Sequence, residues 1–202
     1  ILLLLGIGFF MGIFLATYQI GSESLFLSKL GEQYLDLAFF TAGGLGIIST
    51  LFYIFLQKRI NYSTLVVTNI FLIFAFMAAM RAAFEFTNYD GTQEGFQLLP
   101  FLMFVMVGPV TAITLLNFWG IFGRMFDLRQ SKRIIGGVDT GQLIATIIAF
   151  FSVPFITRLP FINETYDLLM VAAVASFGVL FFTLWIIKDY NLDKATKTKN
   201  KE

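Results

Sequence analysis

Apolar residues along this chain form six long blocks, separated by short polar stretches that carry most of the charges. A helix needs about 20 apolar residues to cross the hydrocarbon core of a membrane, and each block has that length. Backbone polar groups find no water inside a membrane, so we predict that each block is helical. The apolar residues do not alternate as they do in a barrel strand. The predicted spans are residues 1–22, 37–57, 60–80, 95–123, 134–157 and 168–187.

The composition agrees with an all-α membrane protein of six transmembrane helices. Of 202 residues, 57% are hydrophobic and 13% are charged, whereas about 25% are charged in a typical soluble domain. This balance excludes a soluble enzyme, a disordered chain and a nucleic-acid-binding protein. The chain has no Cys and no His, and it contains no phosphate loop, metal-ligand cluster or nucleophile motif. We therefore expect no catalytic residue, metal or cofactor, and we expect that the protein is not an enzyme.

The basic residues predict the orientation of the spans. Most Lys and Arg residues follow the second, fourth and sixth spans, and the opposite connections are richer in acids. The positive-inside rule then places both ends of the chain in the cytoplasm. Residues 1–187 are predicted to form one six-helix domain, and residues 188–202 form a lysine-rich tail. This tail is interpreted as a topology anchor, an anionic-lipid binder or a linker to a further domain.

The fourth span contains Pro109, which predicts a kink near the middle of the membrane. Thr111, Thr114 and Asn117 follow it along the same helix. One interpretation is that these side chains line a cavity on a kinked helix. The other is that they form ordinary hydrogen bonds between helices.

Charged residues in or near the spans supply the other candidates for transport or gating. Arg81 and Glu85 are four residues apart near the outer end of the third span, as a self-neutralised pair or an anion site. Asp139 lies inside the fifth span and is predicted to belong to a cytoplasmic charge network or to act in coupling. Glu23, Glu85 and Asp139 are the candidate proton-coupling carboxylates. The basic members of the charge network are Arg124, Arg129, Lys132 and Arg133.

Small residues at four-residue spacing give two helices a flat stripe. Such stripes let helix backbones approach closely, either for fixed packing or as a surface that slides in a transporter. The stripes are Gly8, Gly12 and Ala16 in the first span, and Gly137, Gly141 and Ala145 in the fifth.

Two motifs carry a resemblance to a known family. The stretch 104–150 resembles the ATP/ADP translocase family of bacteria and plastids in its Asn117-Phe118-Trp119-Gly120 sequence and in the pair Lys132-Arg133. The loop Gln57-Lys58-Arg59 before Asn61-Tyr62-Ser63 is also similar to that family's loop between its second and third helices. Six spans with both ends inside are similar to one half of a major-facilitator transporter.

The resemblance implies a major-facilitator-like half that exchanges nucleotides, with the first and fourth helices lining the cavity. It also implies a bacterial inner membrane. The chain departs from the family pattern because its first span has no Lys and its fourth span has no carboxylate. Nucleotide phosphates would lack compensating charge in such a cavity. The resemblance therefore supports the six-helix scaffold more strongly than it supports a nucleotide as the substrate.

Two functions are left open. The first is a secondary transporter, or its N-terminal half, that moves a small solute by alternating access, with an anion among the candidates. It requires a second six-helix half from the same chain or a partner. The alternative is a transporter-like scaffold that no longer transports and anchors a larger membrane complex through partner subunits. The lipid bilayer surrounds the protein in both cases.

Overall fold

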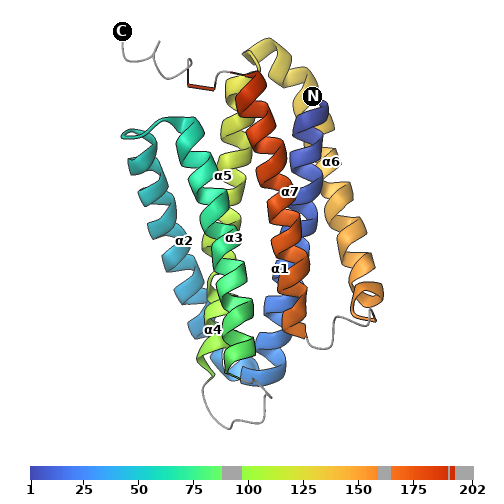
Figure 1. The fold of residues 1–202 in the computed structure, drawn as a ribbon. Helices are drawn as coiled ribbons and strands as arrows, with labels where there is room; N and C mark the ends of the chain where they lie inside the picture. Colours follow the sequence, from blue (N-terminus) through green and yellow to red (C-terminus); the bar gives the residue numbers. More distant parts are fainter. Residues whose placement is uncertain (88–96, 159–164, 191, 194–202) are drawn as a thin grey trace.

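The computed structural model of this protein describes residues 1–87, 97–158, 165–190 and 192–193. These residues form a bundle of antiparallel helices, without a strand among them (Figure 1). Within the described part, six spans are long and apolar enough to cross a membrane, which confirms the predicted fold class. The helices are α1 (Leu2–Leu30), α2 (Leu35–Gln57), α3 (Tyr62–Phe86), α4 (Leu98–Val105), α5 (Val107–Met125), α6 (Leu128–Ile156) and α7 (Leu168–Asp189), with short 3₁₀ turns η1 (Glu32–Tyr34) and η2 (Thr165–Asp167).

The start of α1 and the end of α7 lie at the same end of the bundle, which we call the terminal end (Figure 1). The opposite end, where α1 ends and α7 begins, is the distal end. An even number of spans requires this arrangement. It agrees with the prediction that both ends of the domain lie on one side of the membrane.

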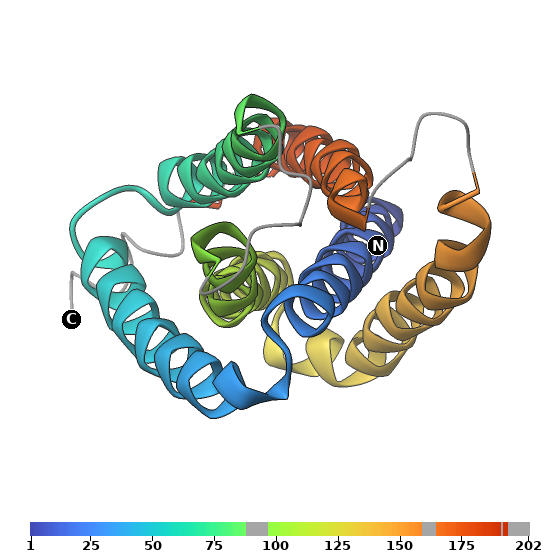
Figure 2. The same ribbon diagram turned by 90° about the horizontal axis from the view of Figure 1, so that it is seen from below.

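The helix α1 lies inside the bundle, between α6 on one side and α7, α4 and α5 on the other (Figure 2). In the most apolar stretch of α1, 50% of the residues are buried, whereas in that of the span containing α2 only 6% are buried. The helix α2 lies at the periphery and contacts the rest of the bundle through Ala38, Ala42 and Tyr53. Both α2 and α6 therefore turn most of their apolar surface outward.

Three helices extend well beyond the limits that the sequence predicts: α1, α6, and α3, which ends at Phe86 instead of residue 80. The helix α1 continues past residue 22 to Leu30 and ends before Gly31, which has a φ of 72°. Glycine adopts this left-handed conformation without the steric cost of a Cβ. The helix α6 begins at Leu128, six residues before the predicted start, so its first turns carry the basic residues.

The glycine stripe of α1 packs against α6. A Cβ built on Gly12 would lie 2.9 Å from the main-chain oxygen of Gln142 and 3.0 Å from the Cβ of Ala145. A Cβ built on Gly141 would lie 2.8 Å from a methyl carbon of Leu5, whereas Gly137 has nothing within 4 Å. The stripe therefore brings the two helices close together at Gly12, Gly141 and Ala145, as both interpretations require, and Gly137 does not take part.

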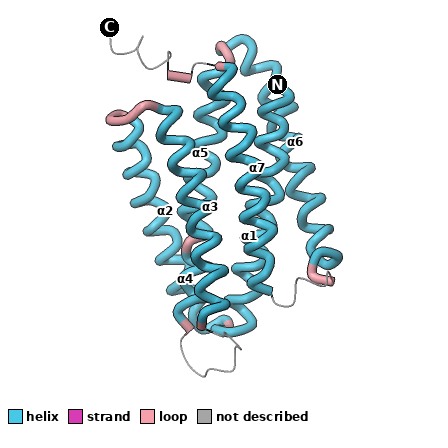
Figure 3. Tube along the Cα trace, viewed as in Figure 1, coloured by secondary structure: helices cyan, strands magenta, loops and turns pink. Residues whose placement is uncertain are grey.

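The fourth span is interrupted, as Pro109 predicts. It consists of α4 and α5, which are separated at Met106, and Figure 3 shows this interruption as a short non-helical segment. A proline has no N–H for the carbonyl group four residues earlier, which is that of Val105, and its ring crowds that carbonyl. The interruption therefore lies about one turn before Pro109 itself.

Candidate functional site

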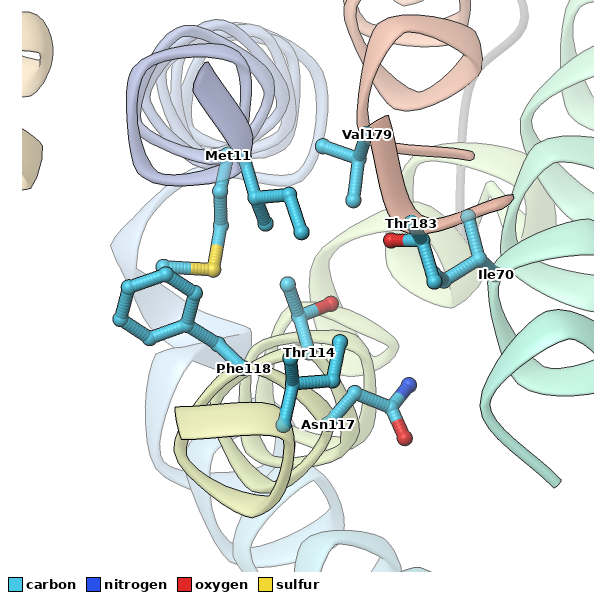
Figure 4. A pocket seen from close by; sticks show the side chains of 9 residues that line it. Met11, Ile70, Thr114, Asn117, Phe118, Val179 and Thr183 are labelled. Carbon is cyan, nitrogen blue, oxygen red and sulfur yellow. The ribbon is translucent and has the colours of Figure 1, made fainter. Parts of the chain in front are cut away.

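A small cavity lies between α1, α3, α5 and α7, in the half of the bundle nearer the terminal end (Figure 4). Its volume of about 10 Å³ corresponds to room for roughly one water molecule. Most of its lining is apolar and comes from Ile, Met, Phe and Val side chains of all four helices. The polar members are Thr114 and Asn117 on α5 and Thr183 on α7.

The polar side chains of this cavity are buried and incompletely hydrogen-bonded. The Nδ2 of Asn69 on α3 donates to the Oδ1 of Asn117 at 3.4 Å, and the Oγ1 of Thr114 donates to the Val110 carbonyl oxygen at 2.7 Å. The Nδ2 of Asn117 and the Oγ1 of Thr183 are buried and have no hydrogen-bond partner among the described residues. Such a group costs about 1–3 kcal/mol, so native proteins rarely keep it without a bound water or ligand.

The interruption of the fourth span positions Asn117. The helix α5 starts anew at Val107, so its direction is set by its own contacts instead of by α4. Asn117 and Thr114 are three residues apart and lie on the same face of α5, toward α3 and α7. The sequence interpretation that this polar flank lines a cavity therefore holds for Thr114 and Asn117.

A tyrosine and an arginine lie between this cavity and the terminal end. The hydroxyl of Tyr62, at the start of α3, donates to the main-chain oxygen of Asn117 at 3.0 Å. The guanidinium of Arg124 lies over the Tyr62 ring, with its Cζ 3.5 Å from the ring centroid, and donates to the Gly120 oxygen at 3.3 Å. Cation–π contacts of this kind stabilise a buried aromatic ring by about 0.5–2 kcal/mol. The pair is linked to the cavity through the main chain of Asn117 and does not itself line it.

A second charged cluster lies at the distal end. Arg81 bonds Glu85 at 2.7 Å, as predicted, and it also bonds Asp167 at the start of α7 at 2.9 Å. The Arg81 guanidinium lies 5.2 Å from the Tyr166 ring centroid, and that ring stacks on Phe84 at 4.9 Å. Arg81 and Glu85 therefore do not form an isolated ion pair on α3, because Arg81 also joins α3 to the start of α7.

The described residues show no ion pair between Asp139 and the basic residues of the predicted charge network. Asp139 lies on the exposed face of α6 and forms no ion pair within the described part of the chain. Arg124 instead contacts Tyr62, on the far side of α1 from α6. The reason is that α6 begins early, which places the other basic residues on its exposed first turns. These residues are Arg129, Lys132 and Arg133.

The polar residues at the distal end of α1 also differ in their surroundings. Tyr18 and Ser22 are buried, and the Tyr18 hydroxyl donates to the Met103 carbonyl oxygen on α4 at 2.7 Å. Glu23 is on the other side of α1 and accepts a hydrogen bond from Gln19 at 2.8 Å. Glu23 is not among the residues that line the cavity, and it forms no ion pair with Arg81. Its predicted role in proton coupling has no neighbouring partner to support it among the described residues.

Sequence reasoning missed four members of these two sites. Asn69 is a single amide inside an apolar span, and such a residue could have been singled out. Tyr62 was noted only within the loop that resembles the translocase family. Thr183 carries no signal, because a lone Thr in an apolar helix is common. Asp167 immediately precedes the sixth apolar run, so the sequence indicates only an acidic residue in a connection between spans.

No family model, characterised protein or solved structure matches the chain. The resemblance to ATP/ADP translocases therefore stays a prediction. The fold and the chemistry of the two clusters are the basis for the function proposed below.

Proposed function

We propose that this chain is a six-helix half of a secondary transporter, which moves a small solute with few charges by alternating access. The observation that carries the proposal is the pair of unpartnered buried polar atoms in one cavity, Asn117 Nδ2 and Thr183 Oγ1. They come from two different helices and face the same space (Figure 4). The cavity holds roughly one water molecule as it stands. Once it is widened, a solute with a hydroxyl, carbonyl or carboxylate oxygen would satisfy both atoms.

The lining of the cavity favours a solute with little charge over a nucleotide. No charged side chain lines it among the described residues, and the arginine on α5 is held at the Tyr62 ring. Several phosphate charges would lack a cation there. A neutral or singly charged solute needs only the hydrogen bonds that the cavity offers.

The interrupted fourth span supports a moving part. Transporters commonly build their solute sites at discontinuous helices, where short segments tilt independently. Here Asn117 lies on α5, beyond the break, and α4 is held separately through Tyr18. A tilt of α5 would open the cavity without moving α4.

The test uses the absence of cysteine from these 202 residues. A single Thr183→Cys variant of the full-length protein is reconstituted in liposomes and treated with a thiol reagent, with and without nucleosides, sugars, amino acids, ADP or ATP. We expect one uncharged or singly charged class to slow the labelling, and radiolabelled members of it to be taken up. Uptake should be lost in Asn117→Ala and kept in Thr140→Val, which is on the exposed face of α6. Uptake unchanged in Asn117→Ala would remove the cavity from the mechanism.

One observation indicates further protein against α6, which either of the two functions would supply. Asp139 is a carboxylate on the exposed face of α6, where intramembrane charges normally face protein or water. Further protein against α6 would explain its position, as a second transporter half or as the partner of a non-transporting scaffold. Native mass spectrometry after gentle extraction separates these two. A second six-helix unit supports transport, and stable unrelated subunits support the scaffold.

A further inference from the structure

We propose that the outward face between α3 and α7, near the distal end, is a binding site for one phospholipid with a primary-amine headgroup, such as phosphatidylethanolamine. The proposal is independent of the solute cavity. It rests on an open groove of about 430 Å³ that both helices line. The groove is apolar along its length and ends at a cluster of charges.

Alanines make the groove concave. Ala78 and Ala82 are one turn apart on α3, and Ala173 faces them from α7. Their short side chains leave a furrow between larger neighbours. Phe74 lines the groove at the end away from the charges, and its ring centroid is 6.3 Å from that of Phe177. An acyl chain would fill this furrow better than another helix, because a helix needs a width of about 10 Å.

The length of the furrow suits an acyl chain. Phe74 and Glu85 are eleven residues apart on α3, which corresponds to roughly 16 Å along the helix. Within a bilayer, where other lipids are equally apolar, the furrow supplies shape. The choice of lipid must come from the headgroup.

The charges at the rim select the headgroup. Arg81 is shared by two carboxylates, Glu85 at 2.7 Å and Asp167 at 2.9 Å, and Glu85 is the one that lines the groove. Asp167 is buried, whereas the Glu85 side chain is 69% exposed, at the mouth of the groove. A primary ammonium donates charge-assisted hydrogen bonds to such a carboxylate. A choline headgroup has no N–H to donate, and a phosphatidylglycerol adds a second negative charge.

The test is native mass spectrometry of the full-length protein with phosphatidylethanolamine, phosphatidylcholine and phosphatidylglycerol of identical acyl chains. We expect the protein to retain phosphatidylethanolamine several-fold better than the other two. In Glu85→Gln this preference should disappear while some lipid is still retained. Glu23→Gln, which removes another carboxylate outside the groove, should keep it.

A groove-filling variant makes the test independent of charge. Ala78 is exposed, so Ala78→Trp fills the furrow without entering the core. We expect it to lose the bound lipid whatever the headgroup, with unchanged thermal stability. Equal retention of the three lipids by the unaltered protein overturns the proposal. So does an unchanged preference in Glu85→Gln, or the capture of a polypeptide in place of lipid.

Discussion

The Tyr62 hydroxyl on α3 donates a hydrogen bond of 3.0 Å to the main-chain oxygen of Asn117 on α5, the residue whose side chain lines the cavity. Tyr18 on α1 makes the equivalent bond of 2.7 Å to Met103 on α4. The two segments of the interrupted fourth span are thus held by two tyrosines from different helices. A motion of α5 that opens the terminal end must break the Tyr62 bond and leave the Tyr18 bond intact.

Removing the Tyr62 hydroxyl should loosen α5. In Tyr62→Phe we expect a loss of about 1 kcal/mol in the free energy of unfolding, the usual worth of one hydrogen bond. The ring still stacks under Arg124, so the helix positions persist. A cysteine placed at Thr183 should then react faster with a thiol reagent that enters from the terminal end. Tyr190→Phe, at an exposed tyrosine on the same end, provides the control. Equal labelling rates in both backgrounds would remove Tyr62 from any gating role.

Gly120 should be intolerant of a methyl group. A Cβ built there overlaps the Tyr62 hydroxyl, whereas a Cβ at Gly123 meets nothing within 4 Å. We expect Gly120→Ala to cost about 1–3 kcal/mol, as overpacking does in a core. Gly123→Ala should be neutral or slightly stabilising, because alanine favours a helix. Thermal unfolding in detergent measures both.

A double variant locates the cause of that cost. In the Tyr62→Phe background the hydroxyl is gone, and Gly120→Ala should cost less than it does alone. Contacting residues commonly show coupling of about 0.5–3 kcal/mol in such a cycle. Additive costs would mean that the methyl group acts elsewhere than on Tyr62.

The hydropathy pattern was sufficient to predict six spans and the interruption near Pro109. Both follow from physics that is local in sequence: the length needed to cross a bilayer and the missing N–H of proline. The partner of Arg81 was different. Glu85 lies one helical turn away and is predicted from the spacing, but Asp167 is separated from Arg81 by two complete spans and is not. Spacing along the chain cannot reveal which helices become neighbours.

The same limit applies to the predicted charge network around Asp139. The sequence placed Asp139 and Arg124 on the same side of the membrane, so a charge pair between them was a reasonable expectation. In the structure α1 packs against α6, and the arginine faces α3 instead. Membrane depth can be predicted from sequence, whereas the direction in which a side chain faces depends on packing. Helix packing also brings the buried side chains of Asn117 and Thr183 to one cavity. The sequence alone indicates only Asn117 as a candidate.

The contact between α1 and α6 gives a pair of glycine variants with opposite expected signs. Gly12→Ala would bring a Cβ within 2.9 Å of the main-chain oxygen of Gln142, which cannot rotate away. The helices must separate, at a cost of about 1–3 kcal/mol. Gly137→Ala, one turn before Gly141 on α6, has open space and should gain up to about 1 kcal/mol. Thermal unfolding that ranks the two variants equally would contradict this packing.

The two carboxylates that share Arg81 should differ in their worth for stability. Asp167 has a side chain that is 5% exposed and joins α7 to α3, whereas Glu85 is 69% exposed and lies on the same helix as Arg81. Removing a buried partner leaves a charge poorly compensated, and exposed pairs contribute only about 0–1 kcal/mol. We therefore expect Asp167→Asn to lower the unfolding temperature clearly and Glu85→Gln to change it little. Added salt should weaken the Glu85 contribution first, because dissolved ions screen exposed charges more strongly than buried ones. If Glu85→Gln were the more damaging variant, the join between α3 and α7 would not depend on Asp167.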